Sequence, residues 1–155
     1  MISTVHCVLS TVEDTRAFGE RLGRVLRAGD LVVLVGPLGA GKTALTQGIG
    51  AGLGVVGAVT SPTFVISRVH RPGPDGRAPL VHVDAYRLGG VLEVDDLDLD
   101  ASVEDSVTVV EWGEGLVEQL SASRLEVRID RRDDDVREVT LVPRGGDWAD
   151  RLATL

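Results

Sequence analysis

Eight consecutive residues carry the side chains and the backbone freedom that phosphate binding needs. They fill the pattern G-x-x-x-x-G-K-[ST], and they run Gly36-Pro37-Leu38-Gly39-Ala40-Gly41-Lys42-Thr43. Glycines let such a loop turn tightly, so that its N–H groups converge on an anion. Lys42 can reach the β- and γ-phosphates of a nucleotide, and the Thr43 hydroxyl can be a ligand of Mg²⁺. We assign these residues, with the following Ala44, to a nucleotide site; the alternative is a glycine-rich turn that binds nothing.

The residues on either side of this loop support the nucleotide interpretation. The apolar run Leu31–Val35 before it is typical of a strand buried on both faces, and residues 44–53 after it can form a helix that ends near Gly54. The motif requires this strand–loop–helix context. Lys42 is also the only lysine in the sequence, so the remaining basic side chains are all Arg. A compact ammonium is therefore expected to have a task here that a planar guanidinium would not perform.

Two carboxylates each end an apolar, strand-like run, and both are candidates for metal binding and hydrolysis. Asp84 ends the run Leu-Val-His-Val-Asp, and Glu111 follows Val-Thr-Val-Val. Open α/β sheets bind ligands at the carboxyl ends of their strands, so we expect Thr43, Asp84 and Glu111 to meet at one Mg²⁺ and one water. Asp84 would hold the metal directly or through water; alternatively it only caps a strand. His82 faces the same side as Asp84, either as a hydrogen-bond partner or as a buried structural imidazole.

A hydroxyl-rich loop and a tryptophan are further candidates for nucleotide contact. Ser61 and Thr63 flank Pro62 about where P-loop enzymes often have a switch segment, and they can meet the γ-phosphate or the Mg²⁺ shell. As a plain loop this segment would be unremarkable. Trp112 follows Glu111 and can cover the nucleotide, although a core tryptophan fits its position equally well.

The hydrophobic pattern predicts one α/β domain over residues 1–155. A Ser10-Thr11-Val12-Glu13 capping box before an amphipathic stretch predicts one helix, and the segment that follows the phosphate loop predicts a second. Short helices are also expected at 116–120 and around Trp148. Strands are expected at 5–9, 31–35, 64–69, 80–84, 107–110, 125–129 and 136–142. The fold class that follows is a P-loop NTPase fold, with a mixed, mainly parallel sheet, helices on both faces and antiparallel additions.

Composition restricts the partners. The net charge of −8 and a pI near 4.8 argue against a broad surface for nucleic acid or anionic membranes. Cys7 is the single cysteine, which excludes an intramolecular disulfide and a cysteine metal cluster. No apolar run approaches the roughly 18 residues of a membrane span, and the first residues lack the pattern of a signal peptide. We expect a cytoplasmic protein that does not bind membranes.

Taken together, four motifs resemble those of the TsaE (YjeE) family, small bacterial P-loop ATPases required for threonylcarbamoyladenosine modification of tRNA. They are the phosphate loop, Ser61-Pro62-Thr63-Phe64, the H-x-D-x-Y-R segment His82-Val83-Asp84-Ala85-Tyr86-Arg87, and the E-W-x-E segment Glu111-Trp112-Gly113-Glu114. Their order and spacing are far more specific than the loop alone. The sequence departs from the family at Asp98, where we expect glycine, and this concerns the acidic segment 93–105 and not the nucleotide site.

The resemblance implies a Mg²⁺-dependent ATPase acting with two proteins, TsaB and TsaD. Because the arginine that meets the γ-phosphate often comes from a neighbouring protein, we expect turnover of the isolated chain to be slow. Asp84 and Glu111 would serve Mg²⁺ and hydrolysis, and Ser61 and Thr63 would be switch-like. TsaD transfers the threonylcarbamoyl group to A37 of tRNA, so this chain would meet tRNA only indirectly, and ATP turnover would support cycling of the complex. Arg87 is the best internal candidate for the γ-phosphate.

Other nucleotide-binding classes fit less well. A GTPase needs N/T-K-x-D, which a chain whose only lysine is Lys42 cannot contain, and the L-S-G-G-Q signature of ABC ATPases is absent. A small-molecule kinase stays open, with lid arginines among Arg68, Arg71 and Arg77. A binding module in which ATP is a conformational ligand and hydrolysis is incidental also stays open.

Overall fold

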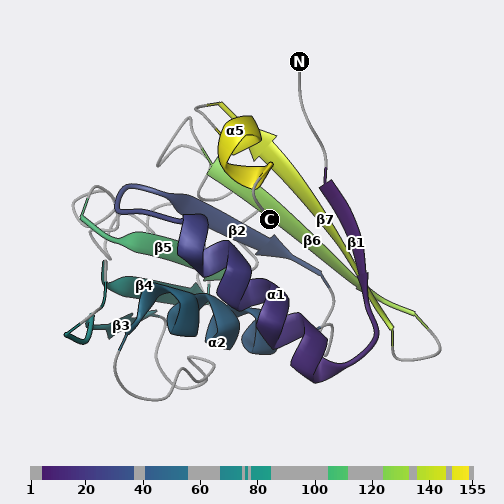
Figure 1. Cartoon of the computed structure of the whole chain (residues 1–155), viewed down its shortest axis with the longest axis horizontal. Helices are drawn as coiled ribbons and strands as arrows, with labels where there is room; N and C mark the ends of the chain where they lie inside the picture. Colours follow the sequence, from purple (N-terminus) through teal and green to yellow (C-terminus); the bar gives the residue numbers. More distant parts are fainter. Residues whose placement is uncertain are drawn as a thin grey trace.

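Seven strands form one sheet in a computed structural model that describes residues 5–36, 41–55, 67–74, 76, 78–84, 105–111, 124–132, 136–145 and 148–153. The strands are β1 (Val5–Leu9), β2 (Leu31–Val35), β3 (Ser67–His70), β4 (Leu80–Asp84), β5 (Val107–Glu111), β6 (Arg124–Arg131) and β7 (Arg137–Arg144). Their order across the sheet is β1-β7-β6-β2-β5-β4-β3 (Figure 1).

The centre of the sheet is parallel and its two sides are antiparallel. Strands β6, β2, β5 and β4 run in one direction, whereas β7 and β1 on one side and β3 on the other continue the sheet through antiparallel pairs. The predicted mixed sheet with antiparallel additions is therefore confirmed. Because the four central strands point the same way, their last residues lie along one border of the sheet, which we call the carboxyl edge.

Three helices are described: α1 (Val12–Val25), α2 (Lys42–Leu53) and α5 (Trp148–Leu152). Figure 1 shows α1 and α2 side by side over one face of the sheet, with α5 in contact with α1 and β7. The helix predicted at 116–120 lies outside the described residues, so helices on the second face stay a prediction. No helix in the described part of the chain is both long and apolar enough to cross a membrane.

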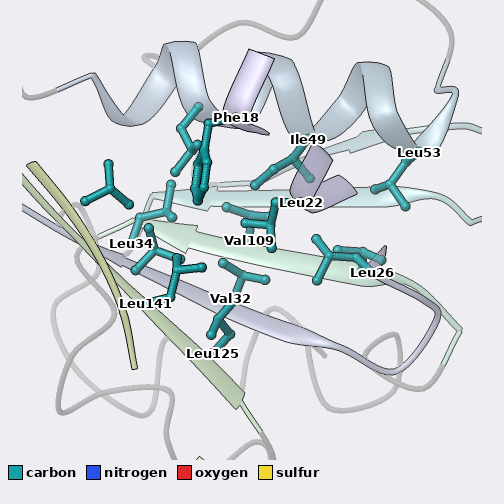
Figure 2. Packing of buried hydrophobic residues seen from close by; sticks show 14 of the residues in the cluster. Phe18, Leu22, Leu26, Val32, Leu34, Ile49, Leu53, Val109, Leu125 and Leu141 are labelled. Carbon is teal, nitrogen blue, oxygen red and sulfur yellow. The ribbon is translucent and has the colours of Figure 1, made fainter. Parts of the chain in front are cut away.

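The core lies between this helix pair and the sheet. Figure 2 shows apolar side chains from both layers meeting there. The labelled residues are Phe18, Leu22 and Leu26 from α1 and its C-cap, Ile49 and Leu53 from α2, and Val32, Leu34, Val109, Leu125 and Leu141 from the strands. Each is almost completely buried. Burial of a side chain of this size is worth about 1.5–3 kcal/mol, so this layer fixes α2 firmly on the sheet.

The two long helices touch backbone to backbone. A methyl group added at Gly48 would overlap the carbonyl oxygen of Arg16, and one added at Gly19 would overlap that of Leu45. Such close approach requires glycine on both helices. The start of α2, and with it the end of the phosphate loop, is thereby held against α1.

Several predicted boundaries differ from the structure. Thr11, and not Ser10, is the N-cap of α1, and its hydroxyl accepts a hydrogen bond of 3.0 Å from Asp14 N–H. Ser10 lies between Thr11 and the last residue of β1, Leu9, which pairs with Arg137. The predicted strands at 125–129 and 136–142 also differ from β6 (Arg124–Arg131) and β7 (Arg137–Arg144), because the charged ends of the two strands pair with each other, Arg124 with Arg144 and Arg131 with Arg137.

Candidate functional site

The start of α2 has no acidic residue and no side-chain cap. Strand β2 is buried along its first four residues and ends at Val35, next to Gly36. After residues 37–40, which lie outside the described residues, Gly41 is the N-cap of α2 with φ +106°, a backbone conformation that favours glycine. It provides no side-chain cap, and the first turn of α2 contains no acidic residue. The positive end of the helix dipole is therefore not neutralised from within α2.

Lys42 lies at this helix terminus and points back toward the loop. Its ammonium Nζ donates to the Gly36 carbonyl oxygen at 2.7 Å, and the residue is 6% exposed. Its carbonyl in turn accepts from the Thr46 hydroxyl at 2.9 Å. The charge is thus held between the two ends of the predicted loop. Thr43 and Ala44 follow as the second and third residues of α2.

The two predicted carboxylate positions are neighbours across two strands. Asp84, the last residue of β4, is the register partner of Glu111, the last residue of β5. Both therefore end at the carboxyl edge, as the sequence predicted. Glu111 is 5% exposed. The side chain of Asp84 lies outside the described part of the structure, as do Ser61, Thr63 and Trp112, so their predicted contacts stay predictions.

Glu111 has one oxygen bound and one available. Its Oε2 lies 3.0 Å from Nε2 of His82, which is fully buried on β4. Within the described residues its Oε1 has no hydrogen-bond or ion-pair partner, and it is not one of the fully enclosed unpaired atoms. A carboxylate oxygen that remains accessible in an otherwise apolar setting can bind a cation. His82 is both hydrogen-bonded and fully buried, so the structure fits each of the two predictions made for it.

These donors fit Mg²⁺. The ion prefers oxygen ligands, usually takes only one or two carboxylates from the protein, and completes its shell with phosphate oxygens and water. Glu111 offers a carboxylate oxygen at the carboxyl edge, and Thr43 adds a hydroxyl on α2. The described residues contain no group of three His, Cys, Asp or Glu side chains that would bind a metal by themselves. A nucleotide phosphate would therefore supply the missing ligands.

One cation close to the start of α2, Arg137, was not predicted from the sequence. A methyl group added at Gly41 would lie 3.5 Å from Nε of Arg137, at the start of β7. Residues 139 and 141 of the same strand belong to the core beneath α1, so Arg137 shares their face. No local signal marks this residue, because its nearness to the loop depends on β7 lying next to β1. The internal candidate named above, Arg87, lies outside the described residues.

Comparisons with known proteins agree with one another. The profile of the family described as "Threonylcarbamoyl adenosine biosynthesis protein TsaE" matches residues 9–139. A "tRNA threonylcarbamoyladenosine biosynthesis protein TsaE" from Streptomyces coelicolor is 63% identical over 139 residues, which cover 86% of this chain and 93% of that protein. The protein of the same description from Bacillus subtilis is 40% identical over 134 residues, covering 86% and 82%. The crystal structure of YdiB from Bacillus subtilis superposes with a TM-score of 0.80 at 32% identity, covering 99% of this chain and 95% of that one.

Proposed function

This chain belongs to the TsaE family, and we propose that it binds and hydrolyses ATP with Mg²⁺ in support of threonylcarbamoyladenosine modification of tRNA. The family supports the role in tRNA modification. We further propose that the chain acts with TsaB and TsaD in the cytoplasm, and that its ATP turnover drives cycling of their threonylcarbamoyl-transfer complex. Contact with tRNA would be left to these partners, in keeping with the net charge of −8.

The observation that carries the proposal is the placement of Lys42 and Glu111 on adjacent parts of one edge. Strand β2 leads into the phosphate loop, and β5, which carries Glu111, is its direct parallel neighbour, with Leu34 in register with Glu111. The loop that would hold the phosphates and the carboxylate that would hold the metal therefore emerge side by side. Burying two charged groups at the same edge costs free energy, and a bound nucleotide with its metal ion would offset that cost.

Each residue then has a defined task. Lys42 would exchange its hydrogen bond with Gly36 for the β- and γ-phosphates, and the N–H groups at the start of α2 would bind the same anion. Thr43, Asp84 and Glu111 would hold Mg²⁺, which neutralises charge on the transferred phosphoryl group. Ser61 and Thr63 would order around the γ-phosphate, and Trp112 would cover the nucleotide.

Turnover by the isolated chain is expected to be slow. Catalysis of phosphoryl transfer depends on positioned charge, and a neighbouring protein often supplies the arginine that completes the site, which is worth several powers of ten in rate. The partners TsaB and TsaD are the expected source of this acceleration.

The test is to titrate the purified chain with ATP by calorimetry, with and without Mg²⁺, and to measure phosphate release alone and with TsaB and TsaD. We expect Mg²⁺-dependent binding, slow release alone and faster release with both partners. A stand-alone rate within the roughly 1–100 s⁻¹ of kinases that does not respond to the partners would overturn the proposal. Phosphorylation of a small acceptor would replace it with the kinase alternative.

A further inference from the structure

His82 is a buried polar residue in an apolar strand. It is 0% exposed, and its neighbours along β4, Val81 and Val83, are buried as well. Its ring makes one hydrogen bond in the described structure, from Nε2 to Glu111 Oε2, whereas Nδ1 is enclosed without a partner. A proton on Nδ1 would leave an enclosed N–H without an acceptor, which costs more than an enclosed lone pair next to apolar groups. The geometry therefore indicates that Nε2 carries the proton and donates a hydrogen bond to the carboxylate.

This arrangement is unfavourable as packing alone. An unsatisfied buried polar atom costs about 1–3 kcal/mol, and an apolar side chain at position 82 would avoid that cost. Such departures from a well-packed core concentrate at functional sites. The hydrogen bond to Glu111 is the feature that an apolar residue could not supply.

The register explains what the bond does. His82 pairs with Val109, and Asp84 pairs with Glu111. The imidazole therefore lies on the same face of the sheet as Glu111, two residues further along the strand from the carboxyl edge. It binds the carboxylate from the core side. Of the two carboxylate oxygens, Oε2 is held there, and Oε1 remains available at the edge.

We propose that His82 is a positioning residue: it fixes the Glu111 carboxylate so that Oε1 faces the metal ion bound with the nucleotide. The inference rests on the proposed function, since it concerns the same Mg²⁺ site. Partners that orient a metal-binding carboxylate typically contribute 10–100-fold to metal affinity or activity. His82 therefore acts on metal binding and not on the nucleotide itself.

The test compares substitutions that keep or move the donor. A glutamine amide places an N–H₂ near the position of the imidazole Nε2, whereas an asparagine amide places it near Nδ1. Binding of a fluorescent ADP analogue is measured without metal and with Mg²⁺, and Mn²⁺ binding to the ADP complex is followed by electron paramagnetic resonance. We expect His82→Asn and His82→Leu to lose about 10–100-fold in Mn²⁺ affinity, with metal-free ADP affinity unchanged, and His82→Gln to stay within a few-fold of the parent.

A second buried histidine provides the control. His70 is 6% exposed on β3 and pairs with Leu80, the first residue of β4, at the opposite border of the sheet. His70→Gln should therefore change thermal stability without changing the metal affinity of the ADP complex. Equal Mn²⁺ affinities for His82→Gln and His82→Asn, or unchanged Mn²⁺ affinity in folded His82→Leu, would overturn the positioning role while leaving the proposed ATPase intact. A parent chain that binds no nucleotide would overturn both.

Discussion

The two ends of β2 both bury charged groups, but only one end satisfies them. At the amino end, Asp30 receives two hydrogen bonds from Arg151, of 2.6 and 3.0 Å, and a third from Arg27 N–H at 2.7 Å. Arg151 also donates to the Val25 carbonyl and lies 3.9 Å above the Trp148 ring. At the carboxyl end, Glu111 and His82 share one hydrogen bond, and each has an atom without a described partner.

This difference separates a structural use of buried charge at Asp30 from the binding use that we propose for Glu111. At the amino end, both oxygens of Asp30 accept hydrogen bonds, and the ion pair with Arg151 joins distant segments of the chain. A buried carboxylate with a spare oxygen is held at a cost in stability, which a bound cation would remove. Substitutions at one end of β2 should therefore change either nucleotide binding and turnover or the free energy of unfolding, but not both.

The largest effect is expected for Lys42→Ala at the carboxyl end. Removing the charge that would stabilise the phosphoryl group in the transition state should lower ATP turnover by about 10³-fold and weaken ATP binding. Circular dichroism should stay close to that of the parent, because the substitution removes a charge at the start of α2 and leaves the apolar layer between the helices and the sheet unchanged. A folded variant with the parent's ATP affinity and rate would show that Lys42 has no part in the site.

Glu111→Gln should have the second-largest effect: ATP turnover should fall by roughly 10²-fold, with a smaller change in ATP affinity. The amide keeps the size of the carboxylate but loses the charge that holds the metal. Asp84→Ala should behave similarly if both strand ends serve one Mg²⁺. Steady-state phosphate release and calorimetric ATP binding measure the two quantities separately, and an unchanged rate would make the substituted carboxylate structural.

At the amino end, Arg151→Met should act on stability alone. We expect the free energy of unfolding to fall by about 2 kcal/mol, less than the roughly 3–5 kcal/mol for breaking a fully buried pair, because the Arg151 side chain is 13% exposed. Nucleotide binding by the folded variant should be unchanged.

The matched control for this variant is an exposed pair on α1. Arg24 and Glu20 also form a 2.7 Å ion pair, with side chains 65% and 43% exposed. Arg24→Ala should cost at most about 0.5 kcal/mol in urea denaturation. Equal losses for the two arginine variants would contradict the idea that Arg151 closes a buried network.

The candidate site could be predicted from the sequence because its main signals are local. Strand β2, the loop and α2 are consecutive in the chain, and an apolar run, a glycine-rich turn and a helix pattern each act over a few residues. The shared edge of Asp84 and Glu111 followed from one general rule about parallel strands. The shared face of His82 and Asp84 followed from strand alternation.

Contacts between distant segments could not be predicted in this way. The bond from His82 to Glu111 requires the register of β4 on β5, and the pair formed by Asp30 and Arg151 joins residues 121 positions apart. Arg137 reaches Gly41 only because β7 lies between β6 and β1. The N-cap was misplaced by one residue because Ser10 and Thr11 have similar capping propensities, and the point where β1 stops pairing decides between them.

The smallest expected effect uses the two tryptophans, one associated with each end of β2. Trp148 is 1% exposed beneath Arg151, whereas Trp112 directly follows Glu111 in the sequence. Strand β2 has five residues, so its first and last Cα atoms are roughly 13 Å apart, further than the roughly 8 Å over which salt screens exposed charges. The charge of bound phosphate should therefore change the fluorescence of Trp112 and leave that of Trp148 almost unchanged.

We expect saturating ADP to change the fluorescence of the parent by a modest amount, and the same change to persist in Trp148→Phe. In Trp112→Phe the change should disappear, because the remaining ring sits in the closed network around Asp30. A response that follows Trp148 instead would mean that nucleotide binding is transmitted along β2 to Arg151. The two ends would then be coupled, and Arg151→Met should alter nucleotide affinity as well as stability.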